Sequence, residues 1–263
     1  MSQLFDVSGR TVLITGGTRG IGLMLAEGLL QAGARVLITS RKADACAAAA
    51  EHLKQFGDVS ALPADVATPE GVEAVRSAVA ESFDGRLDVL VNNAGVSWGA
   101  PLEEFPAVGW DKVLGTNVHA VFALTVALLP ALRANASDAS PTRVINIGSV
   151  DGIRVPSMEN YSYSAAKAAV HMLTRHLAKR LAGERITVNA IAPGPFRSKM
   201  TAFFLDDDAS RKAIGDGIPL GRIGEPDDLV GTTIFLASRA GAYLTGVVIP
   251  VDGGLTGTNP GMF

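Results

Sequence analysis

Residues 11–22 read T-V-L-I-T-G-G-T-R-G-I-G, a short β-rich run followed by a glycine cluster that opens a segment with helical apolar spacing. Strand, glycine turn and helix in this order are typical of a dinucleotide-binding unit. Gly16, Gly20 and Gly22 would allow a tight turn, close approach of a pyrophosphate and packing of the helix on the sheet. The spacing, G-x-x-x-G-x-G, differs from the common fingerprint, and many glycine clusters are only turns. Its place between strand and helix nevertheless favours a phosphate-binding turn.

The end of the second expected strand indicates which dinucleotide would bind. Residues 35–39, R-V-L-I-T, predict this strand, and Ser40-Arg41-Lys42 follows it. An acidic residue at this point selects NAD by holding the ribose 2′-hydroxyl, and none is present. Arg41 and Arg19 of the glycine turn carry guanidinium groups that suit a 2′-phosphate. We therefore expect NADP(H); the alternative is a solvated basic turn.

Short apolar runs alternate with helical patterns along the whole chain. This alternation predicts an α/β fold, a Rossmann-type doubly wound sheet of about seven parallel strands with helices on both faces. No repeat or low-complexity linker divides the chain, so residues 1–263 are expected to form a single domain. The expected strands are 11–15, 35–39, 59–63, 87–91, 144–147, 186–191 and 247–251. The expected helices are 21–32, 43–55, 107–135, 163–181 and 226–238, with another beginning near residue 69.

A second stretch, residues 144–167, carries the candidate chemistry. Ser149 follows its strand, and Tyr163 and Lys167 are spaced to share one face of a helix. An ammonium beside a phenol should lower the phenol's pKa from about 10 and make it a general acid/base, while a serine hydroxyl holds a carbonyl oxygen. Such a pair also occurs by chance, with the Lys only covering the ring, and both interpretations are open here. Tyr161, which has no Lys one turn on, is expected to be a wall residue.

Other polar or small residues follow the expected strands, at the edge of the sheet where ligands bind. Asp65 follows the third strand and could contact an adenine amine, although an isolated Asp there more often caps the next helix. Asn93, Ala94 and Gly95 follow the fourth strand and permit close approach of a ligand. Asn117 lies in an apolar helix, where a polar amide needs a partner, so a structural role is the plain explanation for it.

Composition argues against several classes of protein. The 263 residues are 48% hydrophobic, with a net charge of −3 and no long run of Lys or Arg, which disfavours nucleic-acid binding. Residues 118–132 are apolar but shorter than the ~20 residues of a membrane helix, so we expect a buried or interface helix and no membrane. The single Cys46 and four unclustered histidines give no reason to expect a disulfide or a metal. Without a signal peptide, a cytoplasmic setting is expected.

Residues 196–217 form a long segment that is irregular or weakly helical in pattern. It mixes apolar side chains with three consecutive acidic residues, 206–208. Long insertions of this kind are often lids. We expect residues 196–217 to form a substrate lid, whose apolar side chains would favour an apolar substrate.

Together these motifs resemble the short-chain dehydrogenase/reductase family over nearly the whole chain. The resemblance implies that Tyr163 is the general acid and that Lys167 lowers its pKa and binds the nicotinamide ribose. It further implies that Ser149 orients the substrate carbonyl and that Asn117 holds a water in a proton relay. The motifs are T-G-G-T-R-G-I-G at 15–22, Asp65, N-N-A-G at 92–95, Asn117, Ser149, Y-S-A-A-K at 163–167, P-G at 193–194 and D-G-G at 252–254. The implied cofactor-binding residues are Gly16, Thr18, Arg19, Gly20, Ile21, Gly22, Ser40, Arg41, Asp65, Val66, Asn93, Ala94, Gly95, Tyr163, Lys167, Pro193 and Gly194.

Within this family the chain is similar to the 3-oxoacyl reductases. This implies NADPH-dependent reduction of a ketone to a secondary alcohol, first of all of a 3-oxoacyl thioester. The alternatives are a polyol, sugar-acid or other alcohol dehydrogenase of the same family, and a non-enzymatic nucleotide-binding protein. The few basic residues before the fifth and sixth strands and the acidic residues 206–208 disfavour an acyl carrier protein and leave a CoA thioester or a free ketone open. Family members are commonly homotetramers built on two long helices, which residues 118–132 fit.

Overall fold

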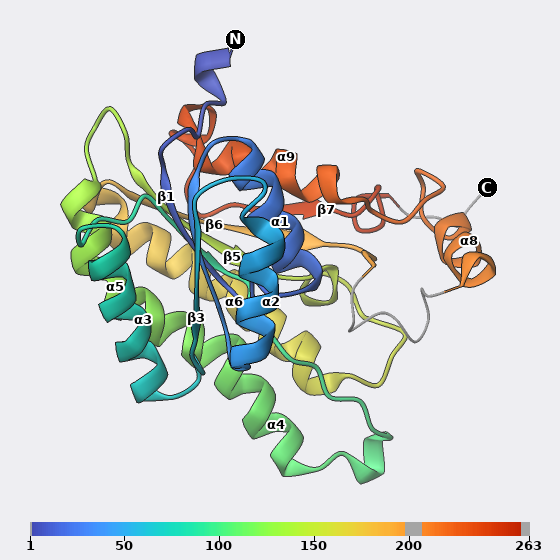
Figure 1. Cartoon of the computed structure of the whole chain (residues 1–263). Coiled ribbons are helices and arrows are strands. Elements are labelled where there is room, and N and C mark those ends of the chain that lie inside the picture. Colours follow the sequence, from blue (N-terminus) through green and yellow to red (C-terminus); the bar gives the residue numbers. More distant parts are fainter. Residues whose placement is uncertain (1, 198–206, 259–263) are drawn as a thin grey trace.

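The sheet of this protein contains seven strands, seen in the computed structural model of Figure 1, which describes residues 2–197 and 207–258. The strands are β1 (Thr11–Thr15), β2 (Arg35–Ser40), β3 (Val59–Pro63), β4 (Val89–Asn92), β5 (Thr142–Ile147), β6 (Ile186–Pro193) and β7 (Val248–Val251). Their order is β3-β2-β1-β4-β5-β6-β7, and all neighbours are parallel. The predicted fold class is confirmed.

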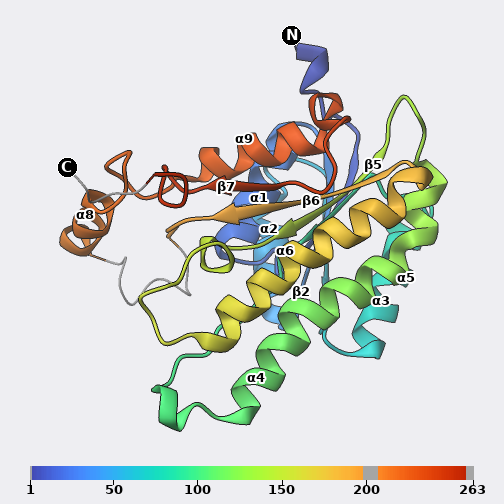
Figure 2. The same cartoon turned by 180° about the vertical axis from the view of Figure 1, so that it is seen from behind.

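Helices cover both faces of the sheet, as Figures 1 and 2 show from opposite sides. One face carries α1 (Gly20–Gln31), α2 (Ala43–Leu53) and α9 (Pro226–Ala237), and the other carries α3 (Pro69–Ser82), α5 (Ala120–Asn135) and α6 (Tyr161–Leu181). Leu25 and Leu229 are fully buried on the first face, and Val75 and Leu124 are buried on the second. The apolar strands are therefore enclosed on both sides, which explains why they read as continuous hydrophobic runs.

The strand order places a switch point between β1 and β4, because the chain builds β2 and β3 outward on one side before it crosses to the other. Ligands of open parallel sheets bind beyond the carboxyl ends of the strands at such a point. Here the two strand ends are joined directly: the Thr15 hydroxyl accepts hydrogen bonds from Asn93 N at 3.0 Å and Ala94 N at 2.9 Å. The glycine turn and the N-N-A-G loop are thereby held next to each other.

The helix predicted over residues 107–135 is present but is not regular. α4 (Ala107–Leu114) and α5 are joined by a π-helical turn, Gly115–His119. As one helix of 29 residues it is long and apolar enough to cross a membrane by length and composition alone, so the shortness of residues 118–132 does not by itself exclude a membrane span. Core helices of soluble proteins pass the same test, and Leu124 and Leu128 of this helix are buried within the molecule.

Several strand boundaries differ from prediction by one or two residues, and at the starts of β4 and β5 polar residues have distant partners. β5 begins at Thr142, since the buried Arg143 donates hydrogen bonds to Leu236 O at 2.9 Å and Ser238 O at 3.0 Å. β4 begins at Val89, and the carboxylate of the preceding Asp88 accepts from Thr11 N at 2.9 Å, while its backbone N–H donates to Thr11 O at 3.2 Å. Neither partner is close in sequence.

The predicted lid segment is helical in its second half. α8 (Asp208–Asp216) follows Asp207, whose carboxylate caps the helix by accepting from Ser210 N at 2.8 Å. Residues 198–206 of the segment lie outside the described residues. The expected weak helicity is thus observed for part of the segment.

Candidate active site

The glycine turn leaves the start of α1 open to a ligand. Gly16 and Gly20 have φ values of 68° and 53°, which glycine adopts without strain. A Cβ on Gly22 would lie 2.3 Å from Gly16 O and 2.4 Å from Asn93 Nδ2, so this position has no room for a side chain. Arg19 precedes α1 and makes no side-chain cap, so no cap covers the first N–H groups of the helix. Such groups bind phosphate oxygens.

The two arginines expected at the 2′-phosphate are exposed. Arg41 directly follows β2, and Arg19 lies in the glycine turn. Neither side chain makes a hydrogen bond or an ion pair with another of the described residues. Unpaired guanidinium groups beside a dinucleotide turn fit a phosphate ligand. The residues of this part of the site therefore suit NADP(H).

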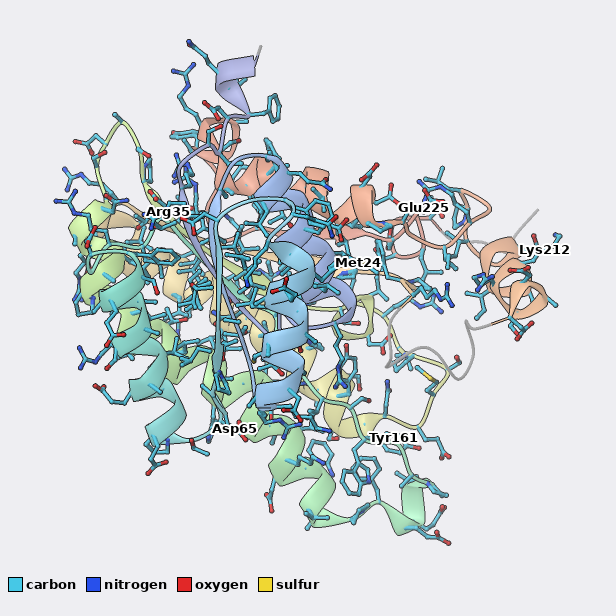
Figure 3. The ribbon with its side chains drawn as sticks, in the orientation of Figure 1. Met24, Arg35, Asp65, Tyr161, Lys212 and Glu225 are labelled. Atoms are coloured by element: carbon cyan, nitrogen blue, oxygen red, sulfur yellow. The ribbon has the colours of Figure 1, made fainter. Side chains whose placement is uncertain are left out.

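Asp65 does not cap the helix that follows β3. Thr68 does so by accepting from Gly71 N at 3.1 Å, while Asp65 Oδ1 accepts from Ala67 N at 3.0 Å within a local turn. The capping explanation is wrong, and the adenine contact stays a prediction. In Figure 3, Asp65 and Tyr161 lie in the lower half of the view, whereas Arg35, at the start of β2, lies well above them.

The structure brings Ser149, Tyr163 and Lys167 together. α6 begins at Tyr161, and its first turns pack against the turn that follows β5. Lys167 is 5% exposed, and its Nζ donates to Ile147 O at 2.7 Å and lies 5.5 Å from the centroid of the Tyr163 ring. Ser149 is 8% exposed, and its side chain interacts with the Tyr163 hydroxyl. The side-chain chemistry needed for proton transfer thus occupies one place.

The proton affinities of this group differ from the prediction. Burial raises the pKa of Tyr163 to about 12, although the hydrogen bond with Ser149 opposes the rise. Burial also lowers the pKa of Lys167 to about 8. The ammonium lies over the ring and bonds a backbone carbonyl, so the expected lowering of the tyrosine pKa is not seen. At neutral pH the phenol keeps its proton and the ammonium keeps most of its charge, which is the form that can donate a proton to a ketone.

Asn117 lies in the π-helical turn and is 1% exposed. Its Nδ2 donates to Val96 O and its Oδ1 accepts from Val96 N, both at 2.9 Å. These bonds confirm the structural explanation and hold the loop after β4. A Cβ on Gly95 would lie 3.4 Å from Asn117 Oδ1 and 3.8 Å from Lys167 Nζ, so Asn117 is close to the catalytic group. Its part in a proton relay stays a prediction.

A buried polar chain behind this group was missed by sequence reasoning. Asn92 Nδ2 donates to Asn146 Oδ1 at 2.9 Å and to Thr125 Oγ1 at 3.3 Å, and Asn146 Nδ2 donates to Thr174 Oγ1 at 2.9 Å. The chain joins β4, β5, α5 and α6 beneath the site. The available signal was one Asn in each of two otherwise apolar strands, which demands a buried partner.

Tyr161 packs against an aromatic neighbour, and its place in a wall of the substrate site stays a prediction. Its ring lies 5.5 Å from that of Phe105 in an edge-on arrangement, and Phe105 contacts Trp110 in the same way at 6.0 Å. The Tyr161 hydroxyl donates to Glu159 Oε1 at 3.0 Å and not to the catalytic residues. No cluster of His, Cys, Asp or Glu suited to a metal is found among residues 2–197 and 207–258.

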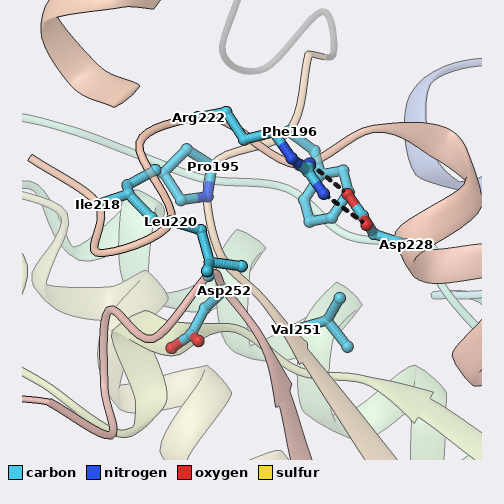
Figure 4. A pocket seen from close by; sticks show the side chains of 10 residues that line it. Pro195, Phe196, Ile218, Leu220, Arg222, Asp228, Val251 and Asp252 are labelled. Atoms are coloured by element: carbon cyan, nitrogen blue, oxygen red, sulfur yellow. Dashed lines mark hydrogen bonds and ion pairs between the residues drawn. The ribbon is translucent and has the colours of Figure 1, made fainter. Parts of the chain in front are cut away.

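A cavity of about 130 Å³ lies beyond Pro193 and Gly194, at the base of the predicted lid. Figure 4 shows it with the ion pair between Arg222 and Asp228, 2.7 Å, beside it. Ser149, Tyr163 and Lys167 are not among the residues that line the cavity, so it does not contain them. The residues that line it are Pro195, Phe196, Ile218, Leu220, Arg222, Gly224, Asp228, Val251, Asp252 and Gly253.

The parallel sheet, the glycine turn and the Ser-Tyr-Lys group define a dinucleotide-dependent oxidoreductase, and the chain belongs to the short-chain dehydrogenase/reductase family. A family model described as enoyl-(acyl carrier protein) reductase matches residues 16–256. Over 254 residues the chain is 51% identical to a rhamnolipids biosynthesis 3-oxoacyl-[acyl-carrier-protein] reductase of Pseudomonas aeruginosa. The matched stretch covers 97% of this chain and 99% of the relative. This confirms a likeness that S-W-G at residues 97–99 and A-Y-L-T-G at 242–246 indicate.

Two further comparisons define the range of relatives. The RhlG/NADP active-site complex of Pseudomonas aeruginosa has a similar structure, with a TM-score of 0.93, 50% identity and coverage of 97% of this chain and 100% of that chain. A 5-keto-D-gluconate 5-reductase of Escherichia coli K12 is 36% identical over 256 residues, covering 97% of this chain and 98% of the relative. The relatives therefore include both acyl and sugar-acid enzymes.

Proposed function

We propose that this chain is an NADPH-dependent reductase that converts a 3-oxoacyl thioester into a 3-hydroxyacyl thioester. The observation that carries the proposal is the meeting of Ser149, Tyr163 and Lys167 beside an open dinucleotide turn. The similarity to a 3-oxoacyl-[acyl-carrier-protein] reductase and to an NADP complex supports the reaction and the cofactor. Bound NADPH supplies the hydride.

Each side chain has a defined task in this reaction. Tyr163 donates its proton to the carbonyl oxygen as that oxygen gains negative charge. The Ser149 hydroxyl donates a hydrogen bond to the same oxygen and orients the carbonyl. Lys167 binds the nicotinamide ribose and stabilises the phenolate that remains after proton transfer. Asn117 sits next to Lys167 and relays the replacement proton through a water.

Exposed apolar side chains in the segment that follows Ser149 favour an acyl substrate over a sugar acid. Ile153, Val155 and Met158 are 45%, 87% and 44% exposed, and they follow the turn that carries Ser149. Exposed apolar groups gathered beside a catalytic site mark a surface for an apolar ligand. An alkyl chain would cover them, whereas a polyhydroxylated chain would leave its hydroxyl groups without partners on them.

The basic side chains before β5 and β6 already have acidic partners, which disfavours docking of an acidic carrier protein there. Arg185 bonds Asp138 at 2.6 Å, and Arg133 bonds Glu184 at 2.6 Å. These pairs also lie at the amino ends of the strands, opposite to Ser149. We therefore propose that the acyl group is presented as a CoA thioester.

Substrate and cofactor are tested together by following NADPH oxidation. We expect turnover with acetoacetyl-CoA, faster turnover with a longer 3-oxoacyl-CoA, and no gain when acyl carrier protein replaces CoA. NADH in place of NADPH should give little activity.

Val155→Asn should reduce the preference for the longer chain while turnover of acetoacetyl-CoA continues. Turnover of 5-keto-D-gluconate without turnover of any thioester would show that the chain is a sugar-acid enzyme.

We also propose a single domain with a lid. One sheet contains strands from Thr11 to Val251, which supports a single folding unit over residues 1–263. The cavity at the base of residues 196–217 supports a lid at that position.

The only cysteine, Cys46, is buried and free, which suits a reducing compartment. We therefore place the enzyme in the cytoplasm, bound to neither membrane nor nucleic acid.

A homotetramer is proposed on the outer faces of the long helices. Figure 2 shows α6 beside α4 and α5 on one face of the molecule. Phe122 and Val126 of α5 are 50% and 45% exposed, and Met172 of α6 is 61% exposed. Apolar side chains one helical turn apart are typical of a helix that packs on a partner. Light scattering should give a mass four times that of the chain, and Phe122→Glu should lower it; a monomer at micromolar concentration would rule the assembly out.

A further inference from the structure

One carboxylate beside the catalytic group has no role in the reaction described above. Asp151 lies two residues after Ser149, in a turn of 3-10 helix, Val150–Gly152. Its backbone N–H donates to the Ser149 hydroxyl at 3.1 Å. Its side chain turns toward α6, where Oδ2 accepts from Asn160 Nδ2 at 3.1 Å. Asp151 is therefore bonded both to a catalytic hydroxyl and to the residue that precedes α6.

Asn160 continues this connection to Tyr163. Its backbone carbonyl accepts from Tyr163 N at 2.8 Å and from Ser164 N at 3.1 Å, so it fixes the first turn of α6. The residue is 4% exposed, and among the described residues its Oδ1 has no hydrogen-bond partner. A buried amide with one oxygen unsatisfied is costly. Its presence indicates that the bond from Nδ2 to Asp151 has a function.

The charges around Asp151 come from both elements that pack there. Burial raises the pKa of Asp151, and Arg154 on its own turn and Lys167 on α6 oppose this rise and favour the charged carboxylate. The carboxylate in turn raises the pKa of Lys167 and adds to the raised pKa of Tyr163. His171, one turn after Lys167, stays neutral because burial lowers its pKa to about 4. A negative Asp151 thus favours a charged Lys167 and a protonated Tyr163.

We propose that Asp151 and Asn160 are a positioning pair that fixes Ser149 relative to Tyr163 and holds the site in the form that reduces ketones. The bonded path runs from the Ser149 hydroxyl through the backbone and carboxylate of Asp151 to Asn160 and the start of α6. The negative charge of Asp151 favours a charged Lys167 and a protonated Tyr163. The hydrogen bonds along the path fix the position of Ser149 relative to Tyr163. The proposal rests on the roles assigned above to Ser149, Tyr163 and Lys167.

Three variants separate charge from geometry. Asp151→Asn removes the charge and keeps an oxygen that can accept from Asn160. Asn160→Ala removes the bond and keeps the charge. Glu159→Gln is the matched control, because it removes an exposed carboxylate next to the same helix. For each, kcat and kcat/KM for ketone reduction with NADPH are measured from pH 6 to pH 10.

In the wild-type protein kcat/KM should fall above about pH 8, where Lys167 loses its charge. Asp151→Asn should move this fall to lower pH by about half a unit or more, because the carboxylate no longer supports the charged lysine. Asn160→Ala should lower kcat about tenfold without moving the fall. Glu159→Gln should change neither, because an exposed charge is screened by solvent.

Two outcomes would overturn the proposal. One is an unmoved pH profile in Asp151→Asn, and the other is a wild-type kcat in Asn160→Ala. If Asn160→Ala does not fold, the profile of Asp151→Asn, which is nearly isosteric, decides alone. Full activity of Tyr163→Phe would instead remove the catalytic assignment on which the proposal rests, so the two failures are distinguishable.

Discussion

Tyr163→Phe is expected to lower kcat for ketone reduction by about 10³-fold while the affinity for NADPH stays at its wild-type value. In the proposed reaction the phenol is the group that donates the proton, and a positioned general acid contributes about 10²–10⁴ in rate. Only one oxygen is removed, and the ring that Lys167 covers at 5.5 Å is kept, so the fold and the cofactor site should persist. Single-turnover kinetics and fluorescence titration with NADPH measure the two quantities separately.

Tyr161→Phe is the control for this experiment. It removes the same oxygen from the same helix, but the Tyr161 hydroxyl bonds only Glu159, which is exposed. We expect its kcat to be close to that of the wild-type protein. Comparable losses in both variants would show that the effect is structural, and unchanged turnover in Tyr163→Phe would refute the assigned role.

Arg41→Ala is expected to raise the KM for NADPH about 10- to 100-fold and to leave the KM for NADH unchanged. A guanidinium bonded to the 2′-phosphate makes charge-assisted hydrogen bonds worth about 1.5–3 kcal/mol, and NADH carries no such phosphate. Arg19→Ala should act in the same direction. In the double variant the preference for NADPH over NADH should nearly disappear, because neither guanidinium group remains to bind the 2′-phosphate. A preference for NADH should not arise, because no acidic residue follows β2 to hold the ribose 2′-hydroxyl.

Arg35→Ala provides the matched control. Arg35 begins the strand that Arg41 follows, but it lies at the opposite end and is paired with Asp58 at 2.8 Å (Figure 3). Its removal should leave both KM values as they are. An equal rise of the KM for NADPH and NADH in Arg41→Ala would show that this arginine does not contact the 2′-phosphate. If the wild-type protein preferred NADH to NADPH, the interpretation of Arg41 and Arg19 as ligands of the 2′-phosphate would be wrong.

The strands and the glycine turn were predictable because their causes are local. A short β-rich run such as residues 11–15 favours a strand through its own local preference, and Gly16 and Gly20 adopt positive φ because glycine does so freely. Tyr163 and Lys167 are neighbours through the helical repeat itself. Boundaries failed where a residue has a remote partner, as with Arg143, whose hydrogen bonds reach the end of α9.

The sequence predicted which residues belong to the candidate site but not the hydrogen bonds that connect them. The capping residue of α3 could have been predicted, because Pro favours the first helical position and Pro69 therefore makes Thr68, not Asp65, the N-cap. The hydrogen bonds from Asn92 to Asn146 and from Asp151 to Asn160 join residues that only the folded sheet brings within reach. Such polar contacts depend on distances between elements, which no local pattern contains.

The sequence by itself determined that this protein is a parallel α/β sheet with a phosphate turn and a Ser, a Tyr and a Lys at its carboxyl edge. Periodicity and backbone preference act within a few residues, so they can be read directly from the chain. Only the tertiary structure decided the proton affinities: Tyr163, expected to be more acidic, has its pKa raised to about 12, and Lys167 has its pKa lowered to about 8. The physical reason is that desolvation depends on all the atoms that surround a group, and most of these come from distant parts of the chain.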